Sequence, residues 1–352
     1  MNDQIRQAVL QLKAGHLVAM PTETVYGLAA DANNPEAVKK IFSTKGRPSG
    51  HPLIVHVATP RAIQEPASNE AKWVKVLEQW SRDVSPEALV LAEQFWPGPL
   101  TMILPKAKNV LSEVTGGQET VGIRCPKHPI AQELLTAFGG GLAAPSANRF
   151  GRISPTTAEH VKDEFPELDL LILDGGPCEV GIESTIVDLS RLDTHGAIVL
   201  RLGAISQEQI NEVLAQVNPQ KVIGRNRTNS EQPRVSGSLS AHYAPKTKMY
   251  LYDSLRPNEL GHTFSLDVEK FHKIAWVHFS KQEKIKPIFQ KNIVKEFLLP
   301  ENPTALAKDL YALLRQLDKL SIDLILFEAL PGDSSWDAVR DRLGRASVGS
   351  GT

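Results

Sequence analysis

PTETVYGLAADA occupies residues 21–32 and directly follows a short apolar run at 16–20. The run has the length of a strand, so the sequence predicts that a strand of an α/β sheet opens here into a loop. Loops at strand ends often carry ligand-binding side chains, and this one offers threonines, a glutamate and a tyrosine. A tight turn with capping hydroxyls would use the same residues without any ligand. Both interpretations stay open at this point.

Helices and short strands alternate around this stretch. Ile5, Val9 and Leu12 predict an amphipathic helix over 2–14, which Gly15 ends. Some later strands follow each other too closely for a parallel crossover, so we expect an α/β domain with a twisted mixed sheet. Further helices are predicted at 35–42, 69–80, 86–95, 128–138, 156–164 and 206–216. Further strands are predicted at 52–57, 100–104, 121–124, 141–144, 170–174, 185–189 and 197–202.

The composition of the chain changes at 218–247, which is polar, rich in turn formers and locally basic. Such a composition is typical of a solvated linker. Strands predicted at 249–252, 274–279 and 322–327, with a helix capped by Asn302 and another from about Ser334, indicate a second α/β domain. We therefore divide the chain into a first domain over 1–212, a linker over 213–247 and a smaller domain over 248–352.

Composition excludes several classes of protein. The 352 residues carry a net charge of −1, which argues against broad coating of nucleic acid. The two cysteines, Cys125 and Cys178, exclude a disulfide scaffold and a four-cysteine zinc site, and they favour a reducing compartment. We find neither a signal-peptide pattern nor an apolar run of about 20 residues, so we expect a cytoplasmic protein without membrane association.

Common enzyme signatures, such as the P-loop, the dinucleotide fingerprint and the nucleophile elbow, do not occur in the chain. Histidines and cysteines show no zinc-ligand spacing, so no dedicated metal site is expected. Lys45 and Arg47 lie two residues apart in a turn rich in Gly and Pro. They can converge on one anion, or they can form a solvated basic turn.

Other turns and strand ends add polar groups. Arg124 ends a predicted strand, where it suits a carboxylate, a phosphate or a surface salt bridge. Small residues at 139–148 would let a ligand approach the backbone, and Ser154 can cap a helix whose N-terminus favours anions. Five basic side chains at such places suggest a polyanionic small ligand such as a nucleotide. They are Lys45, Arg47, Arg124, Arg152 and Arg201.

Several short motifs occur in a fixed order along the chain. They are PTETVYGL at 21–28, KGR at 45–47, PSAN at 145–148, SPT at 154–156, STIVD at 184–188 and HYAP at 242–245. Together they resemble the YrdC/TsaC family, the L-threonylcarbamoyladenylate synthases, and the linker and C-terminal domain resemble its long form. The resemblance implies a YrdC-like sheet with helices around a positively charged concave cavity, and a smaller Rossmann-like α/β domain.

This resemblance also implies a reaction. The family forms L-threonylcarbamoyl-AMP and pyrophosphate from L-threonine, bicarbonate and ATP, so the chain would be a nucleotidyltransferase. A downstream tRNA threonylcarbamoyl-transferase complex would then modify the adenosine next to the anticodon in tRNAs that read ANN codons. Mg²⁺ would accompany ATP, mainly on phosphate oxygens. Direct tRNA binding is expected to be weak or absent.

Site residues follow from the same resemblance. Lys45 and Arg47 would neutralise phosphate charge during catalysis, Arg124 would bind the threonine carboxylate, and Tyr26 would line the pocket. The linker would fold over the site and bring His242 with Tyr243, with Ser236 and Ser238 as further candidates. The chain departs from the family pattern at Leu202 and Gly237, where the family often has proline. The implied threonine site is Thr24, His56, Arg124, Ala144 and Ser184. The implied ATP site is Arg47, His51, Thr120, Ser146, Asn148, Ser154, Arg201 and Tyr243.

Two other functions are weighed against the synthase. A double-stranded-RNA-binding module could use a basic concavity, although the neutral net charge and the lack of an aromatic stacking platform argue against it. A carbamoyl-transfer accessory domain is the other alternative, because similar domains occur inside hydrogenase-maturation proteins. Those proteins also carry zinc-finger segments, which the cysteine count excludes here.

Overall fold

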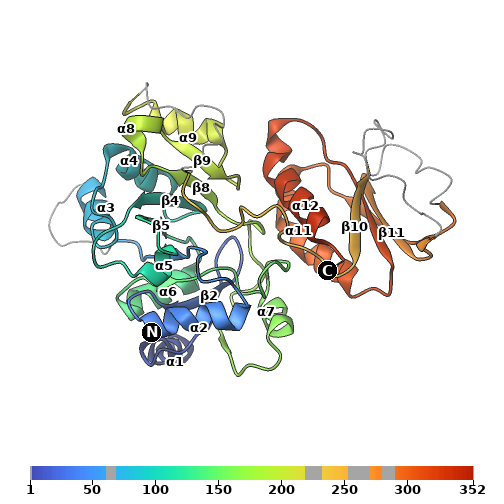
Figure 1. The fold of residues 1–352 in the computed structure, drawn as a ribbon, viewed down its shortest axis with the longest axis horizontal. Helices are drawn as coiled ribbons and strands as arrows, with labels where there is room; N and C mark the ends of the chain where they lie inside the picture. The colour runs from blue at the N-terminus through green and yellow to red at the C-terminus, as the bar shows by residue number, and fades with distance from the viewer. Residues whose placement is uncertain (1, 61–68, 219–231, 253–269, 280–289, 352) are drawn as a thin grey trace. The chain divides into compact units, whose positions relative to one another are not determined.

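The computed structural model describes residues 2–60, 69–218, 232–252, 270–279 and 290–351. The chain forms two compact units (Figure 1). Unit 1 comprises Met1–Phe150 and Ser154–Ser238, and unit 2 comprises Gly151–Ile153 and Leu239–Thr352. The division falls inside the predicted linker, of which residues 219–231 lie outside the described part of the chain.

Unit 1 is built on one nine-stranded sheet. Its order is β7-β1-β2-β6-β3-β5-β4-β8-β9, with parallel and antiparallel neighbours mixed, and this confirms the predicted mixed α/β fold. The strands are β1 (Val18–Met20), β2 (Gly27–Asp31), β3 (Ile54–His56), β4 (Leu100–Pro105), β5 (Thr120–Arg124), β6 (Leu142–Ala143), β7 (Leu171–Ile172), β8 (Thr185–Asp188) and β9 (Ile198–Arg201).

Helices of unit 1 begin and end at recognisable caps. Asn34 caps α2 at its N-terminus, and Gly46, in the left-handed region with φ of 63°, ends it. The helices are α1 (Asp3–Lys13), α2 (Pro35–Lys45), α3 (Asn69–Leu77), α4 (Pro86–Phe95), α5 (Ser112–Thr115), α6 (Pro129–Phe138), α7 (Ala158–Glu164), α8 (Leu192–His195) and α9 (Gln207–Leu214).

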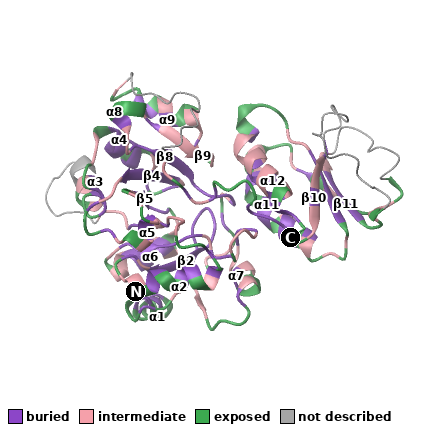
Figure 2. Cartoon of the chain, in the orientation of Figure 1, coloured by how far each residue is buried: buried purple, intermediate pink, exposed green. Residues whose placement is uncertain are grey.

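The two faces of the central strands differ. Val55, Met102 and Ile123 are buried in a core shared with α2, α3, α4 and α9. Figure 2 shows β4 and β8, in the middle of unit 1, as mostly buried. Because successive side chains of a strand point to opposite faces, the residues between them lie on the other face. We call this other face the site face. It carries Ile54, His56, Thr101, Ile103 and Arg124.

Unit 2 contains a four-stranded parallel sheet of order β10-β13-β11-β12, as expected for the smaller Rossmann-like domain. Its strands are β10 (Lys248–Tyr252), β11 (Ile274–Phe279), β12 (Ile293–Leu299) and β13 (Leu324–Glu328). Its helical elements are α11 (Pro303–Asp318), the short η3 (Ser334–Trp336) and α12 (Asp337–Gly349). Asn302 caps α11, as the sequence predicts.

Several predicted elements need correction. Residues 27–31 form strand β2 instead of a loop, since pairing with β1 and β6 outweighs the low strand propensity of glycine and alanine. Strand β12 was not predicted, because its exposed residues hide the alternation that marks a half-buried strand. Arg152 pairs with Ala244 within unit 2, whereas the sequence interpretation grouped it with the basic residues of the first domain.

Candidate functional site

Strand register brings four predicted residues to one edge of the site face. His56 lies directly opposite Arg124 on the parallel pair β3 and β5. The parallel pairing of β4 with β8 places Thr101 opposite Ile186, and the hydroxyl of Ser184, just before β8, lies 2.8 Å from that of Thr101. Thr24 reaches the same edge from the loop between β1 and β2.

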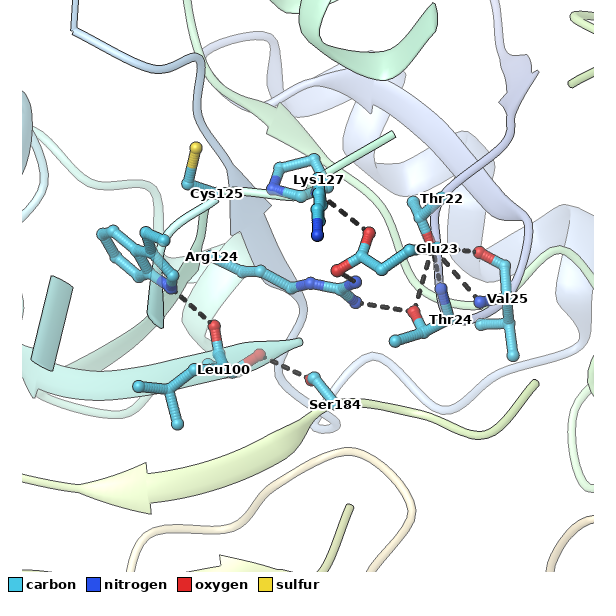
Figure 3. A network of polar contacts seen from close by, with 12 residues as sticks. Thr22, Glu23, Thr24, Val25, Leu100, Arg124, Cys125, Lys127 and Ser184 are labelled. Carbon is cyan, nitrogen blue, oxygen red and sulfur yellow. Dashed lines mark hydrogen bonds and ion pairs between the residues drawn. The ribbon is translucent and has the colours of Figure 1, made fainter. Parts of the chain in front are cut away.

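A buried ion pair forms the centre of this edge. Arg124 donates from Nη2 to Glu23 Oε1 at 2.7 Å and from Nη1 to Thr24 Oγ1 at 2.8 Å (Figure 3). The two charged side chains are 5% and 4% exposed. Glu23 Oε2 accepts a hydrogen bond from the backbone N–H of Lys127 at 3.0 Å. We call Thr22, Glu23, Thr24 and Arg124 the Arg124 corner.

Hydrogen-bond direction within the Arg124 corner follows from its geometry. Thr22 donates its hydroxyl proton to the carbonyl of Val25 at 2.6 Å. In the 2.9 Å contact between the two threonine hydroxyls, Thr24 is therefore the donor and Thr22 the acceptor. Since Thr24 also accepts from Arg124, its hydroxyl can offer a ligand only an acceptor lone pair.

Next to Arg124, His56 is neutral. Burial, followed by the nearby charge of Arg124, lowers the pKa of its imidazole from 6.5 to about 3. The Nε of Arg124 is buried and has no hydrogen-bond partner within the described residues. The Arg124 corner thus combines one guanidinium, one carboxylate and a neutral imidazole neighbour, with a donor still available.

A second group of polar residues lies where α2 ends. The Nζ of Lys45 donates to the carbonyl oxygens of Ser146, at 2.5 Å, and of Asn148. Arg47 donates from Nη2 to the Pro52 carbonyl at 2.9 Å and to Ser236 Oγ at 3.0 Å. Arg201 donates to the Ser236 carbonyl at 2.9 Å. We call Lys45, Arg47, Arg201 and Ser236 the Lys45 cluster.

The Lys45 ammonium is buried and close to another cation. Burial, and then the charge of Arg47, lowers the pKa of Lys45 well below its ordinary value. An anion bound beside Lys45 would favour the charged form again. The arrangement therefore suits a ligand that brings negative charge with it.

Arg201 joins the two groups within unit 1. Its Nε and Nη2 donate to the carbonyl and the hydroxyl of Ser184, both at 3.0 Å, while its Nη1 holds Ser236. Because Ser184 also contacts Thr101, one guanidinium spans from the Arg124 edge to the Lys45 cluster. A path of hydrogen bonds therefore runs from Thr101 and Ser184 through Arg201 to Ser236.

The remaining predicted residues of unit 1 occupy different places. His51 packs edge-on against Phe150, with 5.3 Å between ring centres. Thr120 begins β5, about 13 Å along the strand from Arg124, and lines a small pocket with Pro52, Ile54 and Ser236. Ala144 N–H is bonded to the Ile54 carbonyl at 3.0 Å. Ser154 Oγ donates to Glu183 at 2.6 Å.

Tyr26 holds a neighbouring loop. Its fully buried hydroxyl donates to the Gly176 carbonyl at 2.8 Å and accepts from Gly175 N–H at 3.0 Å. Burial raises the pKa of this phenol, so it stays protonated at neutral pH. The described contacts therefore give Tyr26 a structural part in the wall formed by residues 174–176.

His242 and Tyr243 belong to unit 2. Tyr243 stacks on Tyr311 with 5.6 Å between ring centres, and the guanidinium of Arg342 lies 5.2 Å from its ring. Their predicted approach to the nucleotide stays a prediction. Of the two linker serines, Ser236 contacts the Lys45 cluster, whereas Ser238 donates to the Val235 carbonyl at 2.9 Å.

Sequence reasoning missed Glu23 and Thr101 as site residues. Glu23 lies inside the PTET motif, and a carboxylate beside threonines that were already candidates was the signal available. Thr101 is in an apolar strand, and only the pairing of β4 with β8 in the folded protein brings its hydroxyl to that of Ser184. Across the described residues, no group of three or more His, Cys, Asp or Glu side chains could hold a metal ion. In the same part of the chain, no helix has both the length and the apolarity that crossing a bilayer requires.

Comparison with known proteins places the chain in a family. Residues 10–203 match a family described as "Telomere recombination" (Sua5_yciO_yrdC), and residues 205–348 match "Threonylcarbamoyl-AMP synthase, C-terminal domain". The threonylcarbamoyl-AMP synthase of Pyrococcus abyssi is 34% identical over 351 residues, covering 98% of this chain and 94% of that protein. The Bacillus subtilis synthase is 36% identical over 347 residues, with 98% and 93% covered.

A solved structure agrees with these matches. The crystal structure of P. abyssi Sua5 complexed with L-threonine is similar over 98% of this chain and 94% of that chain, with a TM-score of 0.79 at 33% identity. The predicted resemblance, including the long form, is thereby confirmed, and it favours the synthase over the RNA-binding module and the accessory domain. The chain belongs to the threonylcarbamoyl-AMP synthase family.

Proposed function

We propose that this protein condenses L-threonine, bicarbonate and ATP to L-threonylcarbamoyl-AMP, pyrophosphate and water. The observation that carries the proposal is the pairing, on one site face, of the charge-balanced Arg124 corner with the cationic Lys45 cluster. A small zwitterion and a polyanion need two such environments side by side. The product would then pass to a tRNA threonylcarbamoyl-transferase complex that modifies tRNAs reading ANN codons.

L-Threonine is assigned to the Arg124 corner. A guanidinium with a free N–H suits an α-carboxylate, and Arg124 Nε is such a donor. The hydroxyl of Thr24 can only accept, so it suits a ligand N–H or O–H. The P. abyssi relative in the crystal structure is complexed with L-threonine, which supports the assignment.

ATP is assigned to the Lys45 cluster. Two guanidiniums and an ammonium near one another repel each other until a polyanion binds between them, so phosphates are the ligands that such a cluster favours. Mg²⁺ would arrive with ATP and be held mainly by phosphate oxygens. His51, Ser146, Asn148 and Ser154 keep their predicted parts in nucleotide binding, and Tyr243 keeps its predicted approach from unit 2.

The order of bond changes follows from the chemistry of a carbamate. The threonine nitrogen adds to a carbon dioxide equivalent, and the carbamate oxygen then attacks the α-phosphorus, from which pyrophosphate leaves. Carbamates are short-lived in water, so a site that excludes water protects the intermediate. Lys45 and Arg47 would neutralise charge that develops on the phosphates, and Arg124 would hold the threonine.

Pyrophosphate release tests the proposed function. Purified full-length protein is mixed with ATP, Mg²⁺ and bicarbonate, with or without L-threonine, and pyrophosphate is measured. We expect release that depends on both L-threonine and bicarbonate, together with a nucleotide product whose mass is that of threonylcarbamoyl-AMP. Release that is independent of threonine, or no release at all, would contradict the proposal.

A further inference from the structure

We propose that Glu23 is a positioning residue, which fixes the Arg124 guanidinium in the orientation that receives the α-carboxylate of threonine. This inference rests on the proposed function, because it concerns the same substrate. Glu23 is buried in the PTET loop, and it was not among the residues that the sequence assigned to the site. It acts on the substrate through Arg124 and does not need to touch it.

Two ends of the guanidinium are already held in the structure. Glu23 Oε1 accepts a hydrogen bond from Nη2 at 2.7 Å, and Thr24 Oγ1 accepts one from Nη1 at 2.8 Å. Nε is then the donor of Arg124 that has no partner among the described residues. A planar guanidinium that is fixed at two nitrogens has its remaining donor direction fixed as well. Locked rotamers of this kind let a site bind without reordering its side chains.

Glu23 itself is anchored independently of Arg124. Its Oε2 accepts from the Lys127 N–H at 3.0 Å (Figure 3). Its backbone carbonyl accepts from the Val180 N–H at 2.7 Å. These bonds tie it to the chain after β5 and to the loop before β8. A carboxylate that is also held by the Lys127 N–H, on a backbone fixed by Val180, would stay with Arg124 when threonine binds, instead of swinging away as a displaceable counter-ion.

Steady-state kinetics of Glu23→Gln test this role. The substitution keeps the shape and the anchoring oxygen but removes the charge that orients Arg124. We expect the KM for L-threonine to rise about 10- to 100-fold, while the KM for ATP changes less than about twofold. A merely structural role would disturb both substrates together, and equal shifts in the two KM values would overturn the proposal.

A threonine analogue sharpens the test. L-Threoninamide lacks the carboxylate, so it should compete with L-threonine weakly, and its inhibition constant should be nearly the same for wild type and Glu23→Gln. If Glu23→Gln weakens threonine and threoninamide equally, the glutamate does not act through the carboxylate. Glu87→Gln, which changes a similarly buried glutamate in α4, is the matched control and should leave both constants unchanged.

A double-mutant cycle covers the case in which the single variant folds poorly. Arg124→Ala leaves Glu23 buried without its ion-pair partner, and adding Glu23→Gln removes that uncompensated charge. We expect the double variant to melt at a higher temperature than Arg124→Ala and to show no further rise in the KM for threonine. Additive losses in KM would overturn the proposal. Wild-type protein is assayed in parallel. Threonine-independent release of pyrophosphate by the wild type would contradict the proposed function itself, whereas the comparison of the variants tests only the role of Glu23.

Discussion

The Arg124 corner and the Lys45 cluster lie on the same sheet face but differ in the balance of their charges. In the Arg124 corner, a buried guanidinium is paired with a carboxylate, and the neighbouring imidazole is neutral. In the Lys45 cluster, cations gather around carbonyl and hydroxyl oxygens, and burial next to Arg47 lowers the pKa of Lys45. From this difference we infer that the charge balance of each region matches the charge of its proposed ligand. A zwitterion needs orientation, and a polyanion needs neutralisation.

Removing the buried ammonium is expected to have the largest effect. Lys45→Met should lower kcat/KM for ATP by about 100-fold or more, because a fixed charge aimed at the phosphates is lost. Steady-state pyrophosphate release measures it. Lys40→Met is the matched control, since Lys40 lies on the same helix and also donates to a carbonyl, that of Gly15 at 2.7 Å. Near-normal rates for Lys45→Met would break the comparison.

Acid should destabilise the fold through His56. Its pKa is about 3 in the folded protein against an ordinary value of 6.5, so below pH 6.5 the unfolded chain binds a proton that the folded chain does not. The free energy of unfolding should therefore fall as the pH drops, with His56 contributing about 1.4 kcal/mol per pH unit at most. By pH 5 the loss from this residue would be about 2 kcal/mol.

Urea unfolding at several pH values measures this slope. His56→Gln should show a smaller loss of stability between pH 6.5 and pH 5, because glutamine does not titrate. Identical slopes in the two proteins would mean that the imidazole next to Arg124 already carries a proton. The Arg124 corner would then be cationic, and the contrast with the Lys45 cluster would fail.

The linker serines offer a smaller and more selective test. Ser236→Ala removes the hydroxyl that Arg47 contacts at 3.0 Å, and it should raise the KM for ATP about tenfold, the size of one hydrogen bond to a charged group. Ser238→Ala removes a hydroxyl that donates to the neighbouring Val235 carbonyl, and its effect should be smaller. A larger increase in the KM for ATP with Ser238→Ala than with Ser236→Ala would mean that Ser238, and not Ser236, is the serine of this segment that supports ATP binding.

Salt should produce the smallest effect, and it bears on the comparison most directly. Raising the ionic strength from about 0.05 M to about 0.5 M should increase the KM for ATP about threefold, since a polyanion meets cations there. The KM for threonine should hardly change, because a zwitterion meets a balanced ion pair. Equal salt dependence of the two constants would show that the two regions do not differ in charge.

Much of the fold could be predicted from periodicity and caps. Asn302 correctly predicts the start of α11, and the apolar runs predict most strands of both sheets to within a few residues. Strand β2 could not be found this way, because Gly27, Ala29 and Ala30 are small residues whose strand geometry comes from neighbours on both sides. Long-range pairing fixed that element, and local propensity did not.

For the site, the residue types that could take part are visible in the sequence: the motif threonines, the Lys45–Arg47 pair and the arginines at strand ends. Which partner each of them has depends on the three-dimensional fold. Strand register set His56 opposite Arg124 and brought Thr101 to Ser184, and the PTET loop delivered Glu23 to a guanidinium about 100 residues away. The physical reason is that a buried charge is tolerated only where folding supplies its counter-charge and hydrogen bonds. That pairing depends on contacts between distant segments, which the local pattern of residues does not encode.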